Sequence, residues 1–288
     1  MEIMRSGQKI TGLWSGSTYT IIKPLGRGGI GAAYLVLKDK KKYCLKASSD
    51  VISLTREYRF IKNTNKKFLP EAYEIDDFIL NNERQHYIIL EYIEGQNLAE
   101  IIRLRKLDLR TVISIAVLIA EIFTEFFKMG YVYTDLKPEN LMLDTKNGIL
   151  RLIDLGSLSE VGGMVREYTS VYDRAFWDCG VRRADDGYAA FEIMMFIANL
   201  LIPVHMYSFN RRGIDLILRK LSGIIPSRLY GIMSDVFKGH AGLAETRERL
   251  TMLCGLAEVA QADCLDLYIN IILVASLIFL VCVILYVL

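Results

Sequence analysis

Short apolar runs in the N-terminal third of the chain have the length and composition of β-strands. β-Branched and aromatic residues dominate them, and glycines or paired asparagines stand between them, as is typical of hairpins. The runs that we interpret as strands are Tyr19–Ile22, Ala33–Leu37, Tyr43–Lys46, Phe78–Leu80 and Tyr87–Leu90. The chain therefore begins with a region rich in β-structure.

One helix is predicted among these strands, and helices dominate after them. Leu54, Tyr58 and Ile61 recur at helical spacing, which predicts an amphipathic helix over Val51–Ile61. Later helical patterns cover Leu107–Phe127, Ala189–Phe209 and, as a few short amphipathic helices, Arg211–Leu256. The pattern thus changes from mainly β to mainly α along the chain.

Three stretches are apolar enough to be weighed as membrane spans. The first, Thr111–Phe127, contains Glu121, and the second, Ala189–Phe209, contains Glu192. A charge at the bilayer centre costs about 2.5–3.5 kcal/mol, so we predict that both stretches are buried helices. The third, Leu267–Leu288, has 22 residues without a charge. At about 1.5 Å per residue it can cross about 30 Å of hydrocarbon, so we expect a transmembrane helix. The alternative is a packed helix of the core.

Composition adds four limits. A net charge of +2 gives no bulk attraction to nucleic acid. The five cysteines contain no C-x-x-C pair, which indicates reduced thiols of a protein that faces the cytosol. The three histidines are isolated and give no metal pattern. Met1–Ser17 is polar and mixed, so we expect no signal peptide.

Polar residues at fixed offsets follow the first long helix. Asp135, Lys137 and Asn140 stand in the run Asp-Leu-Lys-Pro-Glu-Asn, and Asp154 begins Asp-Leu-Gly after an apolar run. Phosphoryl transfer needs a carboxylate to orient the attacking hydroxyl and a cation to balance the phosphoryl charge. It also needs an amide and a second carboxylate for Mg²⁺. This spacing is a strong signal for that chemistry.

A glycine-rich hairpin precedes this motif. Gly26, Gly28 and Gly31 form Gly-x-Gly-x-x-Gly, in which backbone amides can approach phosphate oxygens. The pattern also occurs in dinucleotide sites, but there a helix follows the glycines, whereas here a strand follows. Lys46 lies fifteen residues after Gly31 on the next predicted strand. Glu57, the only acid of the predicted helix, is expected to pair with Lys46; a solvated surface acid is the alternative.

At these residues the chain resembles the protein-kinase family, whose catalytic loop is H-R-D-x-K-x-x-N and whose metal motif is D-F-G. Tyr133 and Thr134 replace the His and Arg, and Leu155 replaces the Phe. The resemblance implies that Asp135 orients the acceptor hydroxyl and that Lys137 stabilises the γ-phosphoryl group. It further implies that Asn140 and Asp154 bind Mg²⁺ or Mn²⁺, while Lys46 and Glu57 clamp ATP.

The resemblance also assigns the adenosine site. Backbone groups of the hinge, Glu91 to Ile93, would bond adenine, and Leu90 would gate the pocket behind it. A polar residue, Asn97, would touch the ribose. The residues expected above and below the adenine ring are small or apolar, as a flat base requires. They are Ala33, Cys44 and Met142.

Two departures bear on regulation. Thr134 removes the Arg that in the family pairs with a phosphate on the activation segment, so we expect no switching by phosphorylation of that segment. No Ala-Pro-Glu closes the segment from Gly156 to Asp186. Within it, Thr169 and Ser170 are candidate autophosphorylation or docking hydroxyls, with ordinary loop hydroxyls as the alternative.

A narrower resemblance covers Thr18 to about Leu253 and the terminal anchor. The segment Tyr168–Trp177, the loop without its Arg, the missing Ala-Pro-Glu and the apolar tail look like sporulation-associated membrane Ser/Thr kinases of endospore-forming bacteria. Those kinases carry a basic stretch before the membrane helix that binds DNA. Here Cys254–Asp266 has three acids and no Lys or Arg, so DNA binding is not expected.

These inferences predict an α+β, two-lobed protein-kinase fold with a β-rich N-lobe, an α-helical C-lobe and one C-terminal transmembrane helix. The expected parts are an extension (1–17), N-lobe (18–93), C-lobe (94–256), linker (257–266) and membrane helix (267–288). The expected function is an ATP-dependent Ser/Thr protein kinase at the cytoplasmic membrane with its catalytic domain in the cytosol. Its partners would be protein substrates, the membrane, and a second copy during autophosphorylation. A nucleotide-binding pseudokinase scaffold and a small-molecule kinase remain as alternatives.

Overall fold

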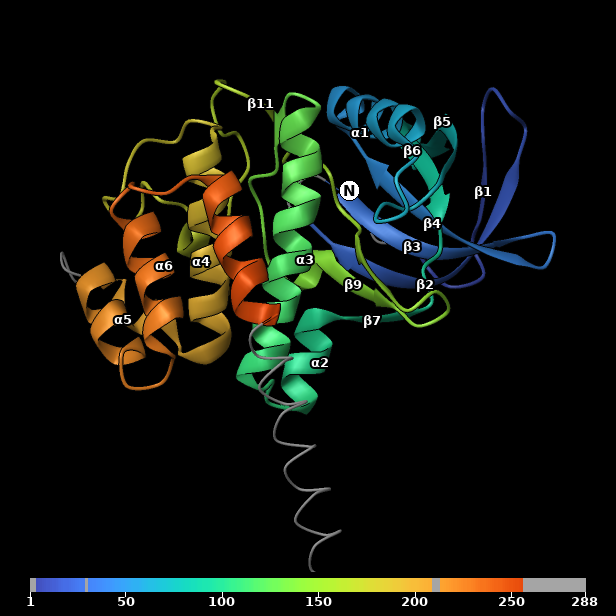
Figure 1. Cartoon of the computed structure of the whole chain (residues 1–288). Helices are drawn as coiled ribbons and strands as arrows, with labels where there is room; N and C mark the ends of the chain where they lie inside the picture. Colours follow the sequence, from blue (N-terminus) through green and yellow to red (C-terminus); the bar gives the residue numbers. More distant parts are fainter. Residues whose placement is uncertain (1–3, 29–30, 209–212, 256–288) are drawn as a thin grey trace, which may run out of the picture. The chain divides into compact units, whose positions relative to one another are not determined.

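The computed structural model describes residues 4–28, 31–208 and 213–255, and they form two compact units (Figure 1). The first unit contains the described residues of 1–106, 133–159 and 165–169. The second contains those of 107–132, 160–164 and 170–255. Every catalytic, nucleotide-binding and metal-binding residue predicted from the sequence belongs to the first unit.

A six-stranded antiparallel sheet forms most of the first unit, in the order β1-β2-β3-β4-β6-β5. The alternating inward residues, among them Ile21, Val36, Leu45 and Ile89, make a buried cluster on one side of it. All five predicted strands are confirmed, and each is longer than predicted. The strands are β1 (Lys9–Thr11), β2 (Thr18–Arg27), β3 (Gly31–Lys38), β4 (Lys41–Ser48), β5 (Ala72–Leu80) and β6 (Glu83–Glu91).

The segment before β2, for which the sequence predicted no element, is part of the sheet. β1 pairs with β2, and the backbone N–H groups of Trp14 and Ser15 donate to the Asp76 carboxylate of β5, the Ser15 bond at 2.8 Å. These bonds hold the carboxylate ionised, and they outweigh the burial that would raise its pKa, so the pKa of Asp76 is lowered. The first residues thereby form one edge of the sheet and are bonded to the strand at its other edge.

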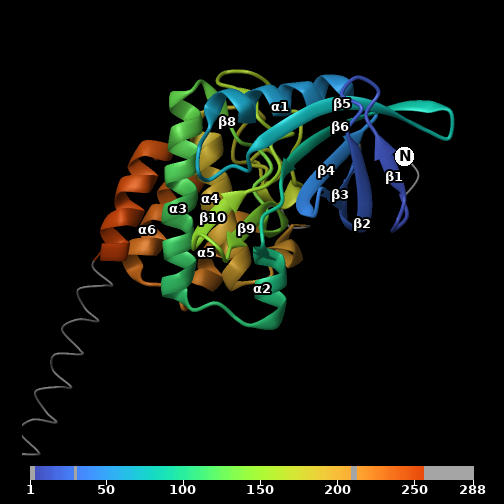
Figure 2. The same ribbon diagram turned by 90° about the vertical axis from the view of Figure 1, so that its right-hand side faces the viewer.

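Helix α1 (Val51–Thr64) packs against β5 and β6 (Figure 2). It begins where the Asp50 side chain accepts from the N–H groups of Ile52 and Ser53, and it ends at Asn65 in the left-handed conformation. Leu54 and Ile61 are buried on its inner face, as predicted, and Glu57 lies between them on the same face. A carboxylate in that position needs a buried partner.

The remaining strands and helices of the first unit are short. These are β7 (Gly95–Asn97), α2 (Leu98–Leu104), the 3₁₀ turn η1 (Pro138–Asn140), β9 (Leu141–Asp144) and β10 (Ile149–Leu152). The last two strands pair with β7 in the order β10-β9-β7. At Gly95 a Cβ would lie 1.9 Å from the Leu143 carbonyl oxygen, so only glycine lets β7 approach β9 this closely.

Helices dominate the second unit. They are α3 (Leu109–Lys128), α4 (Asp186–Leu201), α5 (Gly213–Leu221) and α6 (Ser227–Phe237), and residues 243–255 are also helical. Shorter elements are β8 (Tyr131–Val132), η2 (Ser170–Tyr172) and η3 (Val204–Tyr207), while β11 (Ser159–Glu160) lies where the chain passes from the first unit into the second. Most residues of α4 are themselves buried, and the helix packs against α3 and α6.

The prediction of one helix over Ala189–Phe209 is wrong at its C-terminal end. Helix α4 starts at Asp186, capped by Asp185, and ends at Leu201. Proline cannot continue an α-helix, and Pro203 follows Ile202, the C-cap of α4, so the chain turns into η3. Within residues 4–28, 31–208 and 213–255, no helix has the length and apolarity to cross a membrane. The predicted membrane helix, Leu267–Leu288, lies outside the described residues.

Candidate active site

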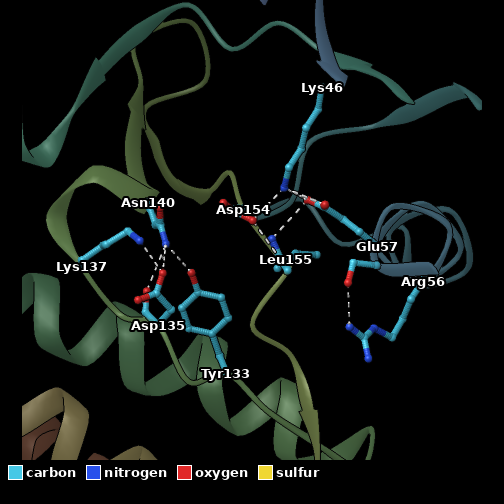
Figure 3. Close-up of polar contacts among 11 residues, drawn as sticks. Lys46, Arg56, Glu57, Tyr133, Asp135, Lys137, Asn140, Asp154 and Leu155 are labelled. Atoms are coloured by element: carbon cyan, nitrogen blue, oxygen red, sulfur yellow. Dashed lines mark hydrogen bonds and ion pairs between the residues drawn. The ribbon is translucent and has the colours of Figure 1, made fainter. Parts of the chain in front are cut away.

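Lys46 joins two carboxylates, one from α1 and one from the loop after β10 (Figure 3). Its Nζ lies 2.9 and 2.7 Å from the two Glu57 oxygens and 2.8 Å from Asp154 Oδ1. Glu57 is only 3% exposed. The predicted ion pair between Lys46 and Glu57 is therefore present, and the sequence-predicted metal carboxylate is in contact with the same ammonium group.

Lys46 favours the ionised form of both carboxylates, whereas burial and the charge of Asp154 raise the pKa of Glu57. Burial alone would lower the pKa of Lys46, but the attraction of Glu57 and Asp154 outweighs it and raises the pKa. Burial would likewise raise the pKa of Asp154, but Lys46 and the Gly156 N–H hold it below its usual range. At neutral pH the site therefore presents a cation for phosphate and an ionised carboxylate for a metal.

The Asp-Leu-Gly motif is fixed to α1 through its backbone. The Leu155 N–H donates to Glu57 Oε1 at 3.2 Å, and the Gly156 N–H donates to Asp154 Oδ1 at 3.0 Å. The Leu155 side chain is buried, which suits an apolar residue at this position. Glu57 thus positions both Lys46 and the metal motif.

The catalytic loop gathers the second group of predicted residues. Lys137 Nζ contacts Asp135 Oδ2, and Asn140 Nδ2 donates to the Asp135 carbonyl oxygen at 3.0 Å. Pro138 begins the single turn η1 that ends at Asn140, so the three polar side chains come from one short segment. On the other side, the Thr169 hydroxyl donates to Asp135 Oδ1 at 2.6 Å.

A buried hydroxyl occupies the position of the family's Arg. Thr134 is 0% exposed, and its Oγ1 lies 2.7 Å from the Ser157 carbonyl oxygen and 2.8 Å from that of Glu167. A hydroxyl has one hydrogen, so the two carbonyls share or alternate as acceptors. Thr134 therefore connects Ser157 and Glu167, which lie at two points of the segment after Asp-Leu-Gly, and this connection needs no phosphate.

The glycine hairpin is built as predicted. Gly26 pairs with Ala33 across β2 and β3, and the Gly28 N–H donates to the Gly31 carbonyl at 2.9 Å. A Cβ on Gly31 would lie 2.6 Å from the Ala47 carbonyl oxygen, whereas at Gly26 it would meet nothing within 4 Å. Packing against β4 therefore requires the third glycine, whereas packing does not require Gly26 or Gly28.

Strand register brings the predicted adenine-site residues together in pairs. Cys44 of β4 lies opposite Leu90 of β6, and Met142 of β9 lies opposite Asn97 of β7. Burial raises the pKa of the Cys44 thiol to about 12, so this wall of the site is uncharged. The Asn97 side chain accepts from the Glu100 N–H at 2.9 Å and caps α2, a role that the sequence analysis did not foresee.

Sequence reasoning missed Arg151, which fixes the side chain of a hinge residue. It is 5% exposed and donates to both Glu91 oxygens at 2.9 and 2.8 Å, to Asp144 at 3.0 Å and to the Leu69 carbonyl at 2.7 Å. The Glu91 N–H is bonded to the Glu71 carbonyl, which leaves adenine recognition to other backbone groups of the hinge. A lone Arg within the apolar run from Ile149 was the available signal.

Local ion pairs occur in the second unit where Ala-Pro-Glu is missing. Arg174 pairs with Asp185, the N-cap of α4, at 2.7 Å, and Arg182 pairs with the fully buried Asp173 at 2.7 Å. The Tyr188 hydroxyl also reaches Asp173 at 3.4 Å. These bonds connect the segment after Ser170 to the start of α4.

Comparisons with known proteins agree with this geometry. The model of the protein kinase domain matches residues 19–178. The serine/threonine-protein kinase YabT of Bacillus subtilis is 30% identical over 214 residues, which are 72% of this chain and 62% of YabT. The probable serine/threonine-protein kinase YbdM of the same organism is 25% identical over 74% of this chain and 82% of its own.

A solved structure shows the same fold. The structure of vaccinia related kinase 3 superposes with a TM-score of 0.66 at 14% identity, covering 90% of this chain and 93% of that one. The fold is thus a two-lobed kinase fold with a β-rich N-lobe and a helical C-lobe. With the family match over residues 19–178 and the polar residues of the catalytic loop and triad in place, the chain belongs to the protein kinase family.

Proposed function

We propose that this chain is an ATP-dependent serine/threonine protein kinase that phosphorylates proteins, itself included. The observation that carries the proposal is the joint placement of two groups within one compact unit. One group is Lys46 with Glu57 and Asp154, and the other is Asp135 with Lys137 and Asn140. An ATP clamp and a catalytic loop together are what phosphoryl transfer to a hydroxyl requires.

The donor set fits Mg²⁺. Asn140 and Asp154 offer an amide oxygen and an ionised carboxylate, the hard oxygen ligands that Mg²⁺ takes together with substrate phosphates. In the described part of the chain no group of three or more His, Cys, Asp or Glu side chains could hold a metal ion by itself. Mg²⁺ or Mn²⁺ bound with ATP would neutralise charge on the β- and γ-phosphates. Lys46 would bind the α- and β-phosphates.

Asp135 is placed to receive the acceptor hydroxyl. Its Oδ1 already accepts a hydrogen bond from the Thr169 hydroxyl at 2.6 Å, which is the contact that a substrate Ser or Thr needs. The substrate oxygen would bond to the γ-phosphorus while the bond from that phosphorus to the ADP oxygen breaks. The hydroxyl proton would pass to Asp135, and Lys137 would balance charge on the transferred group.

Autophosphorylation would use Thr169 or Ser170. Thr169 is bonded to the catalytic carboxylate, whereas Ser170 begins η2. We propose transfer between two copies, in which a hydroxyl of the second copy takes the place of Thr169 at Asp135 of the first. Site-resolved mass spectrometry of protein incubated with ATP tests which hydroxyl carries phosphate.

We further propose that Leu267–Leu288 anchors the kinase in the cytoplasmic membrane with its catalytic domain in the cytosol. The support is its length of 22 residues without a charge. Replacing Ala275 and Val281 together by Arg should release the protein from the membrane fraction, because each charge is costly at membrane depth. Retention of the variant in the membrane would contradict the anchor.

One experiment separates the candidate functions. The full-length protein is incubated with γ-labelled ATP and Mg²⁺, and label is followed on protein and on small molecules. Label on Ser or Thr supports the proposal, and label on a metabolite alone supports a small-molecule kinase. Binding of ATP without any transfer supports a pseudokinase scaffold.

A further inference from the structure

Tyr133 occupies the position of the catalytic-loop His and contacts a predicted metal ligand. Its side chain is 1% exposed, and its hydroxyl accepts a hydrogen bond from Asn140 Nδ2 at 2.8 Å. Figure 3 shows the phenol pointing toward Asn140 from below the catalytic loop. Asn140 is itself 6% exposed, so a change in its environment would not be compensated easily by water.

The contacts of Asn140 define which way its amide faces. Nδ2 also donates to the Asp135 carbonyl oxygen at 3.0 Å, and a carbonyl oxygen can only accept. The nitrogen, not the oxygen, must therefore face Asp135. An amide nitrogen has two hydrogens, and its acceptors are the Tyr133 hydroxyl at 2.8 Å and, on Asp135, the carbonyl oxygen at 3.0 Å and Oδ2 at 3.3 Å. The amide oxygen then points away from both.

We propose that the Tyr133 hydroxyl is a positioning group for the metal site. It holds the Asn140 amide with its nitrogen turned inward, so that Oδ1 is presented to the Mg²⁺ that accompanies ATP. Without this acceptor the amide nitrogen keeps only its two acceptors on Asp135, so the amide is held less firmly and its oxygen is presented to the cation less well. The inference rests on the proposed role of Asn140 in metal binding.

Outer-shell hydrogen bonds are known to matter for metal affinity. Removing a group that orients a ligand typically costs 10- to 100-fold in metal affinity or activity. Asn140 keeps its bonds to the Asp135 carbonyl oxygen and to Asp135 Oδ2 when the phenol oxygen is removed, so we expect about the lower end of that range. Tyr133→Phe removes one oxygen and retains the buried ring, and it therefore isolates the hydroxyl from packing.

The test uses full-length protein and two readouts. Mn²⁺ binding to the protein–ATP complex is measured by electron paramagnetic resonance, and ATP binding is measured in EDTA. We expect Tyr133→Phe to weaken Mn²⁺ binding about 10-fold and to leave metal-free ATP binding unchanged. In an Asn140→Ala background, Tyr133→Phe should cause no further loss of Mn²⁺ affinity, because the hydroxyl acts through that amide.

Tyr87→Phe is the matched control. Tyr87 is also buried, and its hydroxyl donates to Glu74 at 2.7 Å; neither residue belongs to the catalytic loop. Both variants lose one buried hydrogen bond and should melt at a lower temperature than the wild type. Only Tyr133→Phe should change Mn²⁺ binding. If Tyr133→Phe does not fold, Tyr133→Met tests the same loss with a more adaptable side chain.

Three results would overturn the inference. The first is unchanged Mn²⁺ affinity in folded Tyr133→Phe. The second is an equal loss of ATP affinity with and without metal, since this indicates a general disturbance of the site. The third is a further loss in the Asn140→Ala background. A wild-type protein that binds Mn²⁺ with ATP yet labels no protein would refute the proposed kinase activity, while the Mn²⁺ measurements would still decide the role of Tyr133.

Discussion

Glu57 is the residue whose charge most directly controls Lys46. Glu57→Gln keeps the size of the side chain and its position on α1 but removes the negative charge beside the ammonium group. Lys46 then retains one ionic partner, Asp154, at 2.8 Å. We expect Lys46 to move toward Asp154, where it competes with the metal for the same carboxylate.

The expected magnitude follows from the contacts that are lost. Both Glu57 oxygens lie within 2.9 Å of Lys46 Nζ, and hydrogen bonds to charged groups contribute about 1.5–3 kcal/mol. If that interaction is needed in the transition state, kcat/KM for ATP falls about 10- to 150-fold. Competition for Asp154 should also raise the Mg²⁺ concentration needed for half-maximal activity.

The assay is steady-state ADP production at several concentrations of ATP and Mg²⁺. Glu121→Gln is the matched control, because Glu121 is exposed on α3. Thermal melting establishes that both variants are folded. A folded Glu57→Gln protein whose kcat/KM for ATP stays within about threefold of the wild type would refute this reasoning.

Three further predictions concern Arg151, Thr134 and Cys44. Arg151→Met leaves the Glu91 and Asp144 carboxylates without their buried cation, so urea denaturation should show a loss of about 3–5 kcal/mol of stability. Thr134→Val removes the bonds to the two segment carbonyls and should lower label transfer about tenfold, while Thr134→Ser retains activity. Cys44, with its pKa raised by burial to about 12, should alkylate at pH 8 about a thousandfold more slowly than an ordinary cysteine, as measured by site-resolved mass spectrometry.

Each of these has a control and a contrary result. Arg84 has an exposed side chain, so Arg84→Met should lower the free energy of unfolding by less than about 1 kcal/mol. An equally small loss for Arg151→Met would contradict the buried network. Phosphatase treatment should leave wild-type activity intact; its abolition would contradict the phosphate-independent role of Thr134. Unfolded Cys44 ionises near its ordinary pKa and folded Cys44 only at about 12, so its contribution to stability should fall as pH rises through that interval. Rapid labelling of folded protein at pH 8 would contradict this.

Sequence reasoning worked best where the signal was local. Runs of β-branched residues between turns identified β2 to β6, and the spacing of Leu54 and Ile61 identified α1. The pairing of Lys46 with Glu57 was also predicted, because a strand-borne cation and a single acid on the next helix leave few other partners. The family's motif order identified Asp154 as a metal ligand, but its contact with Lys46 was not predicted.

The features that were missed depend on partners far along the chain. Arg151 bonds to Glu91, sixty residues earlier, and Thr134 bonds to the Glu167 carbonyl, thirty-three residues later. A local sequence pattern does not indicate partners that lie so far away along the chain. The strand at Lys9–Thr11 is too short and polar to give a signal by itself. The end of α4 was predictable from the sequence, because Pro203 ends a helical pattern, but the prediction followed the long apolar run instead.

The most direct test of the central claim is the effect of Asp135→Asn on phosphoryl transfer. Full-length wild-type and variant proteins are compared in γ-labelled ATP with Mg²⁺, with Asp39→Asn as the control, because Asp39 lies in an exposed turn at positive φ that asparagine accepts. The account predicts label on Ser or Thr for the wild type and the control, and its loss in Asp135→Asn with ATP binding retained. Equal labelling by folded Asp135→Asn would contradict the assignment of this loop as the catalytic centre.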